Sequence, residues 1–385
     1  MVYELSNNTW DDTEKRAIMA VVESNNFTMG QRTKNFEEAF AEKFEAKYAV
    51  FVNSGSSANL LAVSSLVYSG KLSRGDEIIV PAVSWSTTYT SLVHYGLKLV
   101  FVDIDKHTLN IDPDKIDGAI GAKTKAVFAV NLLGNPAQYD VIIDICQKNN
   151  LVLLEDNCES MGATFMGRYT GGFGLIGTHS TFFSHHICTM EGGIILVSDE
   201  LLYHYMISLR AHGWTRDIPR GSKLYEKDQD DFYEMYNFVL PGYNLRPLEI
   251  EAAIGLLQIA KLDQFIDARR SNAQYFQQRL SILPGVRTQK ETGESSWFGF
   301  PVVLDKGLDR KEVINRLRRE NIEVRPIVGG NFTRNAVMSF IDYRIPEPLT
   351  NADDIHFNGF FIGNHSINIQ EKIDFFVDVL QESIK

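Results

Sequence analysis

The chain of 385 residues is long enough for two domains, and its 44% hydrophobic and 23% charged residues are typical of a soluble globular protein. A net charge of −11 argues against a general nucleic-acid binder or a binder of anionic membranes, because such proteins carry basic surfaces. The first residues are polar and acidic, and no apolar run reaches the length of a membrane span, so we expect a cytoplasmic protein without a signal peptide. Three widely spaced cysteines, Cys146, Cys158 and Cys188, provide no disulfide framework and are too few for an iron–sulfur cluster held by four cysteines of one chain.

Short β-rich runs alternate with helical patterns from about residue 47 to residue 200, which predicts crossover connections and a largely parallel sheet. The expected strands are 48–53, 77–82, 98–105, 125–132 and 151–157, and the expected helices are 56–70, 86–96 and 139–150. The polar run 215–234 predicts a long surface loop.

Sustained helical periodicity from about 247 to 283 could join two domains, and an α+β succession follows it. The sequence therefore predicts a large α/β domain over residues 1–255, with an N-terminal helical segment, and a smaller C-terminal α+β domain over residues 256–385.

The run "VNSGSSANL" (52–60) follows a predicted strand and begins a predicted helix. Backbone N–H groups and small hydroxyls at a helix N-terminus bind anions, and Gly55 permits a close approach. An ordinary serine helix cap explains the same residues, so this run alone does not decide the function.

Three more motifs lie where predicted strands or turns lead into helices. Asp156 stands where a buried strand ends, the place at which open parallel sheets bind ligands, and its carboxylate could pair with a pyridinium nitrogen or simply end the strand. Trp85 could stack on a flat ring or belong to the core. Asn244 and Arg246 could contact phosphate or a second subunit, or cap the helix that follows.

The run "THSTFFSHHICTMEGG" (178–193) places Ser180 five residues before His185 and Glu191 six residues after it. The adjacent His185 and His186 could be metal ligands, but no further ligands stand at a recognisable spacing, so we predict no metal site.

The order and spacing of these motifs resemble the DegT/DnrJ/EryC1 family of sugar aminotransferases, which are fold type I enzymes dependent on pyridoxal phosphate (PLP). The resemblance runs from "FTMGQRTKNFEEAFAEKF" to the region around Arg325-Pro326. It implies a large α/β domain with a mixed, mostly parallel sheet and a smaller α+β domain. It also implies cofactor-binding roles for Gly55, Ser56, Ser57, Trp85, Asp156, Glu159, Ser180 and Asn244.

The resemblance implies a separate role for each of these cofactor-binding residues. The serines would hold the cofactor phosphate, Asp156 would pair with the ring nitrogen, and Trp85 would stack on the ring. Glu159 stands where most members have glutamine near the ring hydroxyl. Asn244, in "GYN", would reach the active site of the neighbouring subunit of a homodimer.

The departure from the family is His185, which stands where members carry the lysine that bonds to the cofactor. One branch has this replacement, the 3-dehydratases of nucleotide-linked 4-keto-6-deoxy sugars, and "SHH", "TMEGG" and "RAHGWTR" are similar to it. The resemblance implies pyridoxamine phosphate (PMP) as resting cofactor, glutamate as amine donor, and a GDP-linked 4-keto-6-deoxy sugar as substrate in dideoxysugar synthesis of the colitose type. His185, with an ordinary pKa of about 6.5, is the expected base.

The residues expected to contact the substrate are His212, Arg216, Arg246 and Arg325, and His186 is expected to be a packed neighbour. Three alternatives stay open. A nucleotide-sugar aminotransferase would need a lysine, and none occurs between Lys148 and Lys223. A non-catalytic cofactor-binding protein would have little reason to keep the other motifs. An iron–sulfur-assisted dehydratase is disfavoured by the cysteine count.

Overall fold

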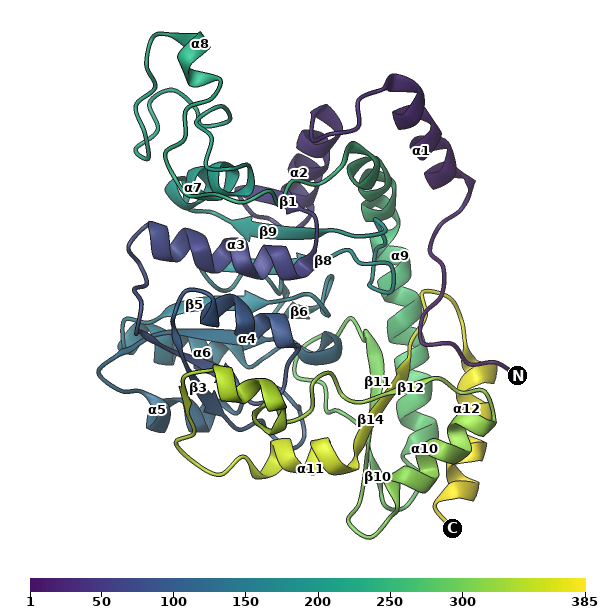
Figure 1. Ribbon diagram of the computed structural model, residues 1–385. Helices are drawn as coiled ribbons and strands as arrows, with labels where there is room; N and C mark the ends of the chain where they lie inside the picture. Colours follow the sequence, from purple (N-terminus) through teal and green to yellow (C-terminus); the bar gives the residue numbers. More distant parts are fainter.

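The computed structural model describes residues 1–385, and its framework is an eight-stranded sheet with helices on both faces (Figure 1). The strand order is β1-β9-β8-β5-β4-β2-β3-β13, in which β9 runs antiparallel to both neighbours and every other pairing is parallel. The strands are β1 (Tyr48–Val52), β2 (Glu77–Pro81), β3 (Lys98–Val102), β4 (Thr124–Val130), β5 (Val152–Asp156), β8 (Ile176–Ser180), β9 (Gly193–Val197) and β13 (Tyr343–Arg344). The five predicted strands and the mixed, mostly parallel sheet are confirmed.

The two faces of this sheet are both apolar because both are covered by helices. Along β1, Val50 and Val52 pack in one hydrophobic cluster with residues of α3, whereas Phe51 packs in another with α2 and α9. Alternate side chains of the strand thus pack against the helices on opposite faces of the sheet. One face carries α3 (Gly55–Tyr68), α4 (Ser86–Val93) and α7 (Glu200–Arg210); the other carries α2 (Gln31–Lys43), α5 (Ile116–Ala119), α6 (Tyr139–Lys148) and the first half of α9 (Glu249–Leu280).

A second, antiparallel sheet forms a separate core near the C-terminus. Its order is β10 (Val286–Arg287), β11 (Gly299–Leu304), β14 (Gly359–Gly363) and β12 (Val324–Arg325), and α10 (Arg310–Arg319), α12 (Gln370–Ser383) and the second half of α9 pack with it. We propose the domain division after residue 255, inside α9. The chain beyond it also returns β13 to the large sheet and continues into α11 (Thr350–Asn358).

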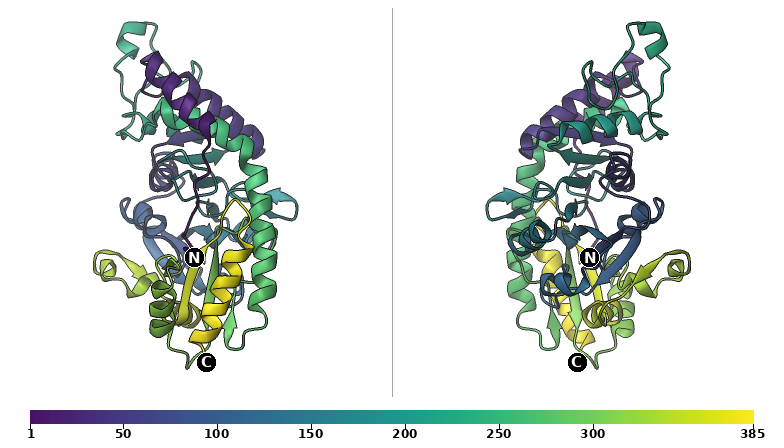
Figure 2. Two further views of the ribbon diagram at one scale, coloured as in Figure 1. Left: turned by 90° about the vertical axis from the view of Figure 1, so that its right-hand side faces the viewer. Right: turned by 90° about the vertical axis from the view of Figure 1, so that its left-hand side faces the viewer.

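The helix α9 links the two cores. It begins with a cap in which the Glu251 side chain accepts a hydrogen bond from the backbone N–H of Leu248 at 2.8 Å. Figure 2 shows α9 running along one side of the molecule, with α1 (Asp12–Ser24) packed near its start and α12 near its end. Its length lets one rigid element contact the N-terminal segment, the large sheet and the small sheet.

The segment 215–238 projects from the body at the upper left of Figure 1. As expected it is mostly irregular, with one short helix, α8 (Asp231–Glu234). A small hairpin of β6 (Thr164–Phe165) and β7 (Arg168–Tyr169) completes the strands. None of the helices combines the length and apolar character that crossing a membrane requires.

Candidate active site

A cavity of about 830 Å³ opens where β2, β5 and β8 end. Its walls come from the start of α3, the junction after β2, the end of β5, the loop after β8, and the chain near Phe298 and Arg325. This is the edge of an open parallel sheet at which ligands bind. Eight of the predicted site residues line it: Gly55, Ser56, Trp85, Asp156, Glu159, Ser180, His185 and Arg325.

Asp156 lies at the end of β5, where its side chain is 6% exposed and faces the cavity. Its Oδ2 accepts hydrogen bonds from Asn59 Nδ2 at 2.8 Å and from Thr88 Oγ1 at 2.7 Å. The Thr178 hydroxyl donates to Asn59 Oδ1 at 2.5 Å, which turns the amide N–H of Asn59 toward the carboxylate. The preceding Glu155 faces away, where it accepts backbone N–H groups of Gly171 and Gly174. Asp156 is therefore a fixed carboxylate with acceptor capacity left toward the cavity.

The N-terminus of α3 forms an anion cradle beside Asp156. Ser54 caps the helix by accepting the backbone N–H of Ser57 at 3.1 Å. A side chain on Gly55 would lie 2.8 Å from the Cβ of Ser180, so glycine alone allows these two segments to meet. The hydroxyls of Ser56 and Ser180 line the cavity, whereas that of Ser57 accepts from the Ser54 hydroxyl at 2.9 Å and lies behind the wall. Helix N–H groups and hydroxyls in this arrangement suit a phosphate.

Two further groups suit an aromatic ring held between the cradle and Asp156. Trp85 lines the wall with 59% of its surface exposed, which leaves its indole free to stack. Glu159 accepts the backbone N–H of Leu133 at 3.0 Å, and burial, together with the charge of Asp156, raises the pKa of its carboxyl to about 7. A carboxyl that keeps its proton near neutral pH can donate a hydrogen bond as a glutamine amide does. The residues present therefore fit a PLP-type cofactor.

His185 lines the cavity on the loop after β8, and its ring lies 5.0 Å from that of Phe298, edge to face. Its Nδ1 is buried without a hydrogen-bond partner. Burial, reinforced by the positive charge of Arg269, lowers the pKa of His185 to about 3. The expectation of an ordinary pKa of about 6.5 is therefore wrong, because the loop folds inward. The imidazole is neutral throughout the physiological range.

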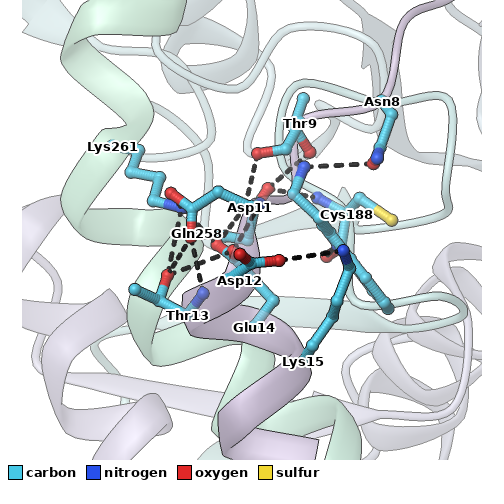
Figure 3. A network of polar contacts seen from close by, with 11 residues as sticks. Asn8, Thr9, Asp11, Asp12, Thr13, Glu14, Lys15, Cys188, Gln258 and Lys261 are labelled. Atoms are coloured by element: carbon cyan, nitrogen blue, oxygen red, sulfur yellow. Dashed lines mark hydrogen bonds and ion pairs between the residues drawn. The ribbon is translucent and has the colours of Figure 1, made fainter.

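The loop that carries His185 is held from two sides. Trp10 Nε1 donates to the carbonyl of Cys188 at 2.9 Å, and the backbone N–H of Cys188 donates to Gln258 Oε1 at 3.2 Å. Gln258, on α9, is itself fixed by Thr9 and Glu14, as Figure 3 shows. On the other side His186 is fully buried, and its Nε2 lies 3.2 Å from the carbonyl oxygen of Ser296. These contacts fix the backbone that follows His185.

The remaining predicted residues are not brought into this cavity. Arg216 and Arg246 lie over the ring of Trp214 at 4.2 and 5.6 Å, and His212 lies 4.7 Å from the same ring. Asn244 is exposed and accepts a hydrogen bond from Arg246 Nε at 3.0 Å. This group, the Trp214 cluster, lies at the base of the projecting segment, apart from the cavity of its own chain.

Sequence reasoning did not identify several residues that build the site. Asn59 lines the cavity and Thr88 donates to Asp156; their spacing after Gly55 and Trp85 was the available signal. Leu5 and Phe298 have no such signal, because only tertiary contacts place them: the backbone N–H of Leu5 donates to Glu323 Oε2 at 3.0 Å, and the Phe298 N–H donates to the carbonyl of Leu133 at 3.0 Å.

Comparison with known proteins gives consistent results. The model of the DegT/DnrJ/EryC1/StrS aminotransferase family matches residues 8–380. The chain is 50% identical to GDP-4-keto-6-deoxy-D-mannose 3-dehydratase of Escherichia coli O55:H7, over 98% of this chain and 99% of that protein. Two solved structures of GDP-4-keto-6-deoxymannose-3-dehydratase, each 50% identical, superpose with a TM-score of 0.96 over 98% of this chain and 100% of theirs. One holds a trapped PLP-glutamate geminal diamine and the other, a mutant, holds GDP-perosamine.

These likenesses extend over nearly the whole chain and include the cavity, so the fold is that of the PLP-dependent aminotransferases. The anion cradle at α3, the carboxylate of Asp156 and the exposed indole of Trp85 agree with these comparisons. The chain belongs to the DegT/DnrJ/EryC1/StrS aminotransferase family.

Proposed function

We propose that this protein is a PMP-dependent 3-dehydratase that converts GDP-4-keto-6-deoxy-D-mannose into GDP-4-keto-3,6-dideoxy-D-mannose. Glutamate supplies the two electrons that replace the C3–O bond by a C3–H bond, and it leaves as 2-oxoglutarate and ammonia. The relative from E. coli O55:H7, which bears that substrate's name, is 50% identical to this chain. We propose that the reaction belongs to dideoxysugar synthesis of the colitose type and takes place in the cytoplasm.

The proposal rests on one observation: the active-site cavity contains the imidazole of His185 where the family has the amine of a lysine. His185 lines the cavity, and no lysine does. A site without a lysine cannot bond the cofactor covalently or expel an amino product with its own amine. An enzyme built this way must hold its cofactor by non-covalent contacts and end its cycle in something other than ordinary amino transfer.

Each cavity group has a role in that scheme. Bound PMP supplies an amine that can bond the sugar C4 and a ring that accepts an electron pair. The α3 N-terminus, Ser56 and Ser180 bind its phosphate. Asp156 pairs with its ring nitrogen, Glu159 donates to its ring oxygen, and Trp85 packs on its face.

His185 moves the proton. With PMP bound, its neutral imidazole would accept a proton from the cofactor methylene carbon, and the cofactor would supply the electron flow needed for loss of the hydroxyl at C3 of the sugar. Because burial and the Arg269 charge lower the pKa of His185 to about 3, the imidazolium gives the proton up readily and can pass it to the leaving hydroxyl.

The test is mass spectrometry of the sugar product. The protein is incubated with PLP, glutamate and GDP-4-keto-6-deoxy-D-mannose, and ammonia is assayed alongside. We expect a product lighter by one oxygen atom, with one ammonia per sugar. A product with an amine in place of the ketone would identify an aminotransferase instead. Cofactor binding without turnover of this or related sugar nucleotides would identify a non-catalytic binding protein, and iron in a fresh preparation would support an iron–sulfur-assisted dehydratase.

We further propose that the protein acts as a homodimer with shared active sites. The cavity is lined by five carboxylates and one guanidinium, that of Arg325; the carboxylates are Glu4, Asp156, Glu159, Glu191 and Glu323. A substrate with a diphosphate needs more positive charge than this wall offers. The Trp214 cluster carries Arg216, Arg246 and Asn244 outside the lining of this cavity, and a second copy could present them to it.

The projecting segment supports this proposal. It exposes large apolar side chains at one place, among them Phe232 at 83% and Tyr236 at 68%. Contiguous apolar surface on a projecting arm is typical of a protein interface. Arg216 and Arg220 are exposed on the same projecting segment. In a dimer in which this segment reaches the partner, both would lie near the partner's cavity.

Mixing two inactive variants tests shared sites. One carries His185→Asn and the other Asn244→Ala, and each alone is expected to be nearly inactive. After denaturation and refolding together, half of the mixed dimers' sites contain intact groups from both copies, so about a quarter of wild-type activity should return. No recovery, with dimers present in the mixture, would show that each cavity uses only its own chain.

A further inference from the structure

One buried arginine near the cavity has no carboxylate partner. Arg269, on α9, is 1% exposed and makes no ion pair. One terminal nitrogen, Nη1, donates to the carbonyls of Trp297 at 3.3 Å, Phe298 at 3.1 Å and Asn364 at 2.9 Å, and its Nε has no partner. Desolvating a charge without a counter-ion is expensive, so burying it in this way calls for a structural reason.

Two of the three carbonyls that Arg269 binds, those of Trp297 and Phe298, belong to the segment that contacts the two histidines. Phe298 lines the cavity, and its ring is 5.0 Å from that of His185 and 5.9 Å from that of His186. The carbonyl of the nearby Ser296 contacts His186 Nε2 at 3.2 Å. Trp297, between them, is held at φ 48°, a conformation that a tryptophan adopts only under constraint. The guanidinium thus pins a strained segment at the wall of the cavity.

The same guanidinium is the charge that acts on both imidazoles. Burial is the main cause that lowers the pKa of His185 and of His186, and the charge of Arg269 comes next for each. Several other titratable groups surround the pair: the neutral His179 on β8, and the cavity carboxylates Asp156, Glu159 and Glu191. Burial and the charge of Asp156 raise the pKa of one of these carboxyls, Glu159, to about 7.

We propose that Arg269 is a positioning residue of the active site: it fixes the backbone of Trp297 and Phe298, so that the Phe298 ring is held against His185, and it sets a positive charge near that imidazole. The proposal rests on the proposed function only in that His185 is the base. Arg269 touches neither cofactor nor substrate and acts through the histidine. It makes the base available in its neutral form without any hydrogen bond to the buried Nδ1 of that ring.

The test is a titration of the histidine rings by NMR on full-length, ¹⁵N-histidine-labelled protein without cofactor or substrate. The His185 signals are assigned by their loss in His185→Asn. In the wild type we expect His185 to stay neutral down to at least pH 5. In Arg269→Gln its pKa should rise by one unit or more, a tenfold gain in proton affinity, whereas Arg269→Lys, which keeps the charge, should shift it much less.

A matched control lies on the same helix. Arg279 pairs with Asp374 and Asp378 at the surface, so Arg279→Gln should leave the titration of His185 unchanged. If Arg269→Gln does not fold, Arg269→Met replaces it, because an apolar side chain brings no buried polar group of its own and its loss of charge unpairs no carboxylate. Identical His185 titrations in the wild type and in a folded neutral variant would overturn the proposal.

Steady-state kinetics of Arg269→Lys test the positioning role of Arg269 separately from its charge. In Arg269→Lys the charge remains, but the shorter side chain cannot place its nitrogen where Nη1 contacts the three carbonyls. We expect kcat to fall about tenfold while the KM for the sugar nucleotide changes less than twofold, because Arg269 does not touch the substrate. An unchanged kcat would exclude this role. Since the NMR titration needs no turnover, a failure of the proposed reaction and a failure of this inference give different results.

Discussion

His185→Asn is expected to lower the rate of dehydration by a factor of about 10² to 10⁴, the usual contribution of a positioned general base. Asparagine is close to the imidazole in size but cannot take up a proton, so the cavity keeps its shape while the proton transfer is lost. Burial and the Arg269 charge lower the pKa of His185 to about 3. The imidazole of the wild type therefore stays in the accepting form as the pH falls from about 7 to about 5, and any acid loss of rate in that range must come from another group.

The measurement is single-turnover loss of the C3 oxygen with PMP-loaded protein, together with the dissociation constant of PMP. PMP binding should change less than about threefold, because the phosphate cradle and Asp156 do not contact this side chain. His107→Asn is the control, since His107 is exposed and outside the cavity. A His185→Asn protein that dehydrates at the wild-type rate would remove His185 from the mechanism.

Most of the large domain could be predicted from the sequence because its strands are short apolar runs between helical patterns. The five expected strands, the helices α3, α4 and α6, and the long helix near 247–283 are all present. The strands β8 and β9 were missed, because β8 contains Gly177 and His179 and β9 is entered through two glycines. The short β13 is added from residues far along the chain and has no local pattern of its own.

The site was predictable in part for a related reason. Gly55, Trp85 and Asp156 stand at or just after the ends of predicted strands, and the ends of parallel strands meet at one edge of the sheet. The sequence did not show the surroundings of the titratable side chains, which set their pKa values. The low pKa of His185 and the raised pKa of Glu159 depend mainly on burial, and for His185 also on Arg269, which approaches only through the tertiary fold. Arg269 itself lies within a long helical pattern, and no neighbouring residue in the sequence indicates that its side chain is buried near the active site.

Asp156→Asn is expected to reduce the affinity for PMP by a factor of about 10 to 100 and to reduce turnover further, because a charge-assisted hydrogen bond is worth about 1.5–3 kcal/mol. The asparagine oxygen can take the place of Oδ2 and keep the hydrogen bonds from Asn59 and Thr88. Its NH₂ group then replaces Oδ1 and faces the backbone N–H of Cys158, which now donates to Oδ1 at 3.2 Å. The ring nitrogen of the cofactor meets a donor where it needs an anion, so it loses its proton and the ring accepts electrons less well.

Glu155 provides the matched control for this variant. It is the neighbouring carboxylate on the same strand, but it faces the opposite side and holds the backbone of Gly171 and Gly174. Glu155→Gln should therefore lower the midpoint of thermal unfolding while leaving the dissociation constant of PMP within about threefold of the wild type. Asp156→Asn should show the reverse, a large loss of PMP binding by equilibrium dialysis with little change in stability. If the two variants lose PMP equally, the loss reflects a loosened β5, and the pairing of Asp156 with the ring nitrogen would have to be abandoned.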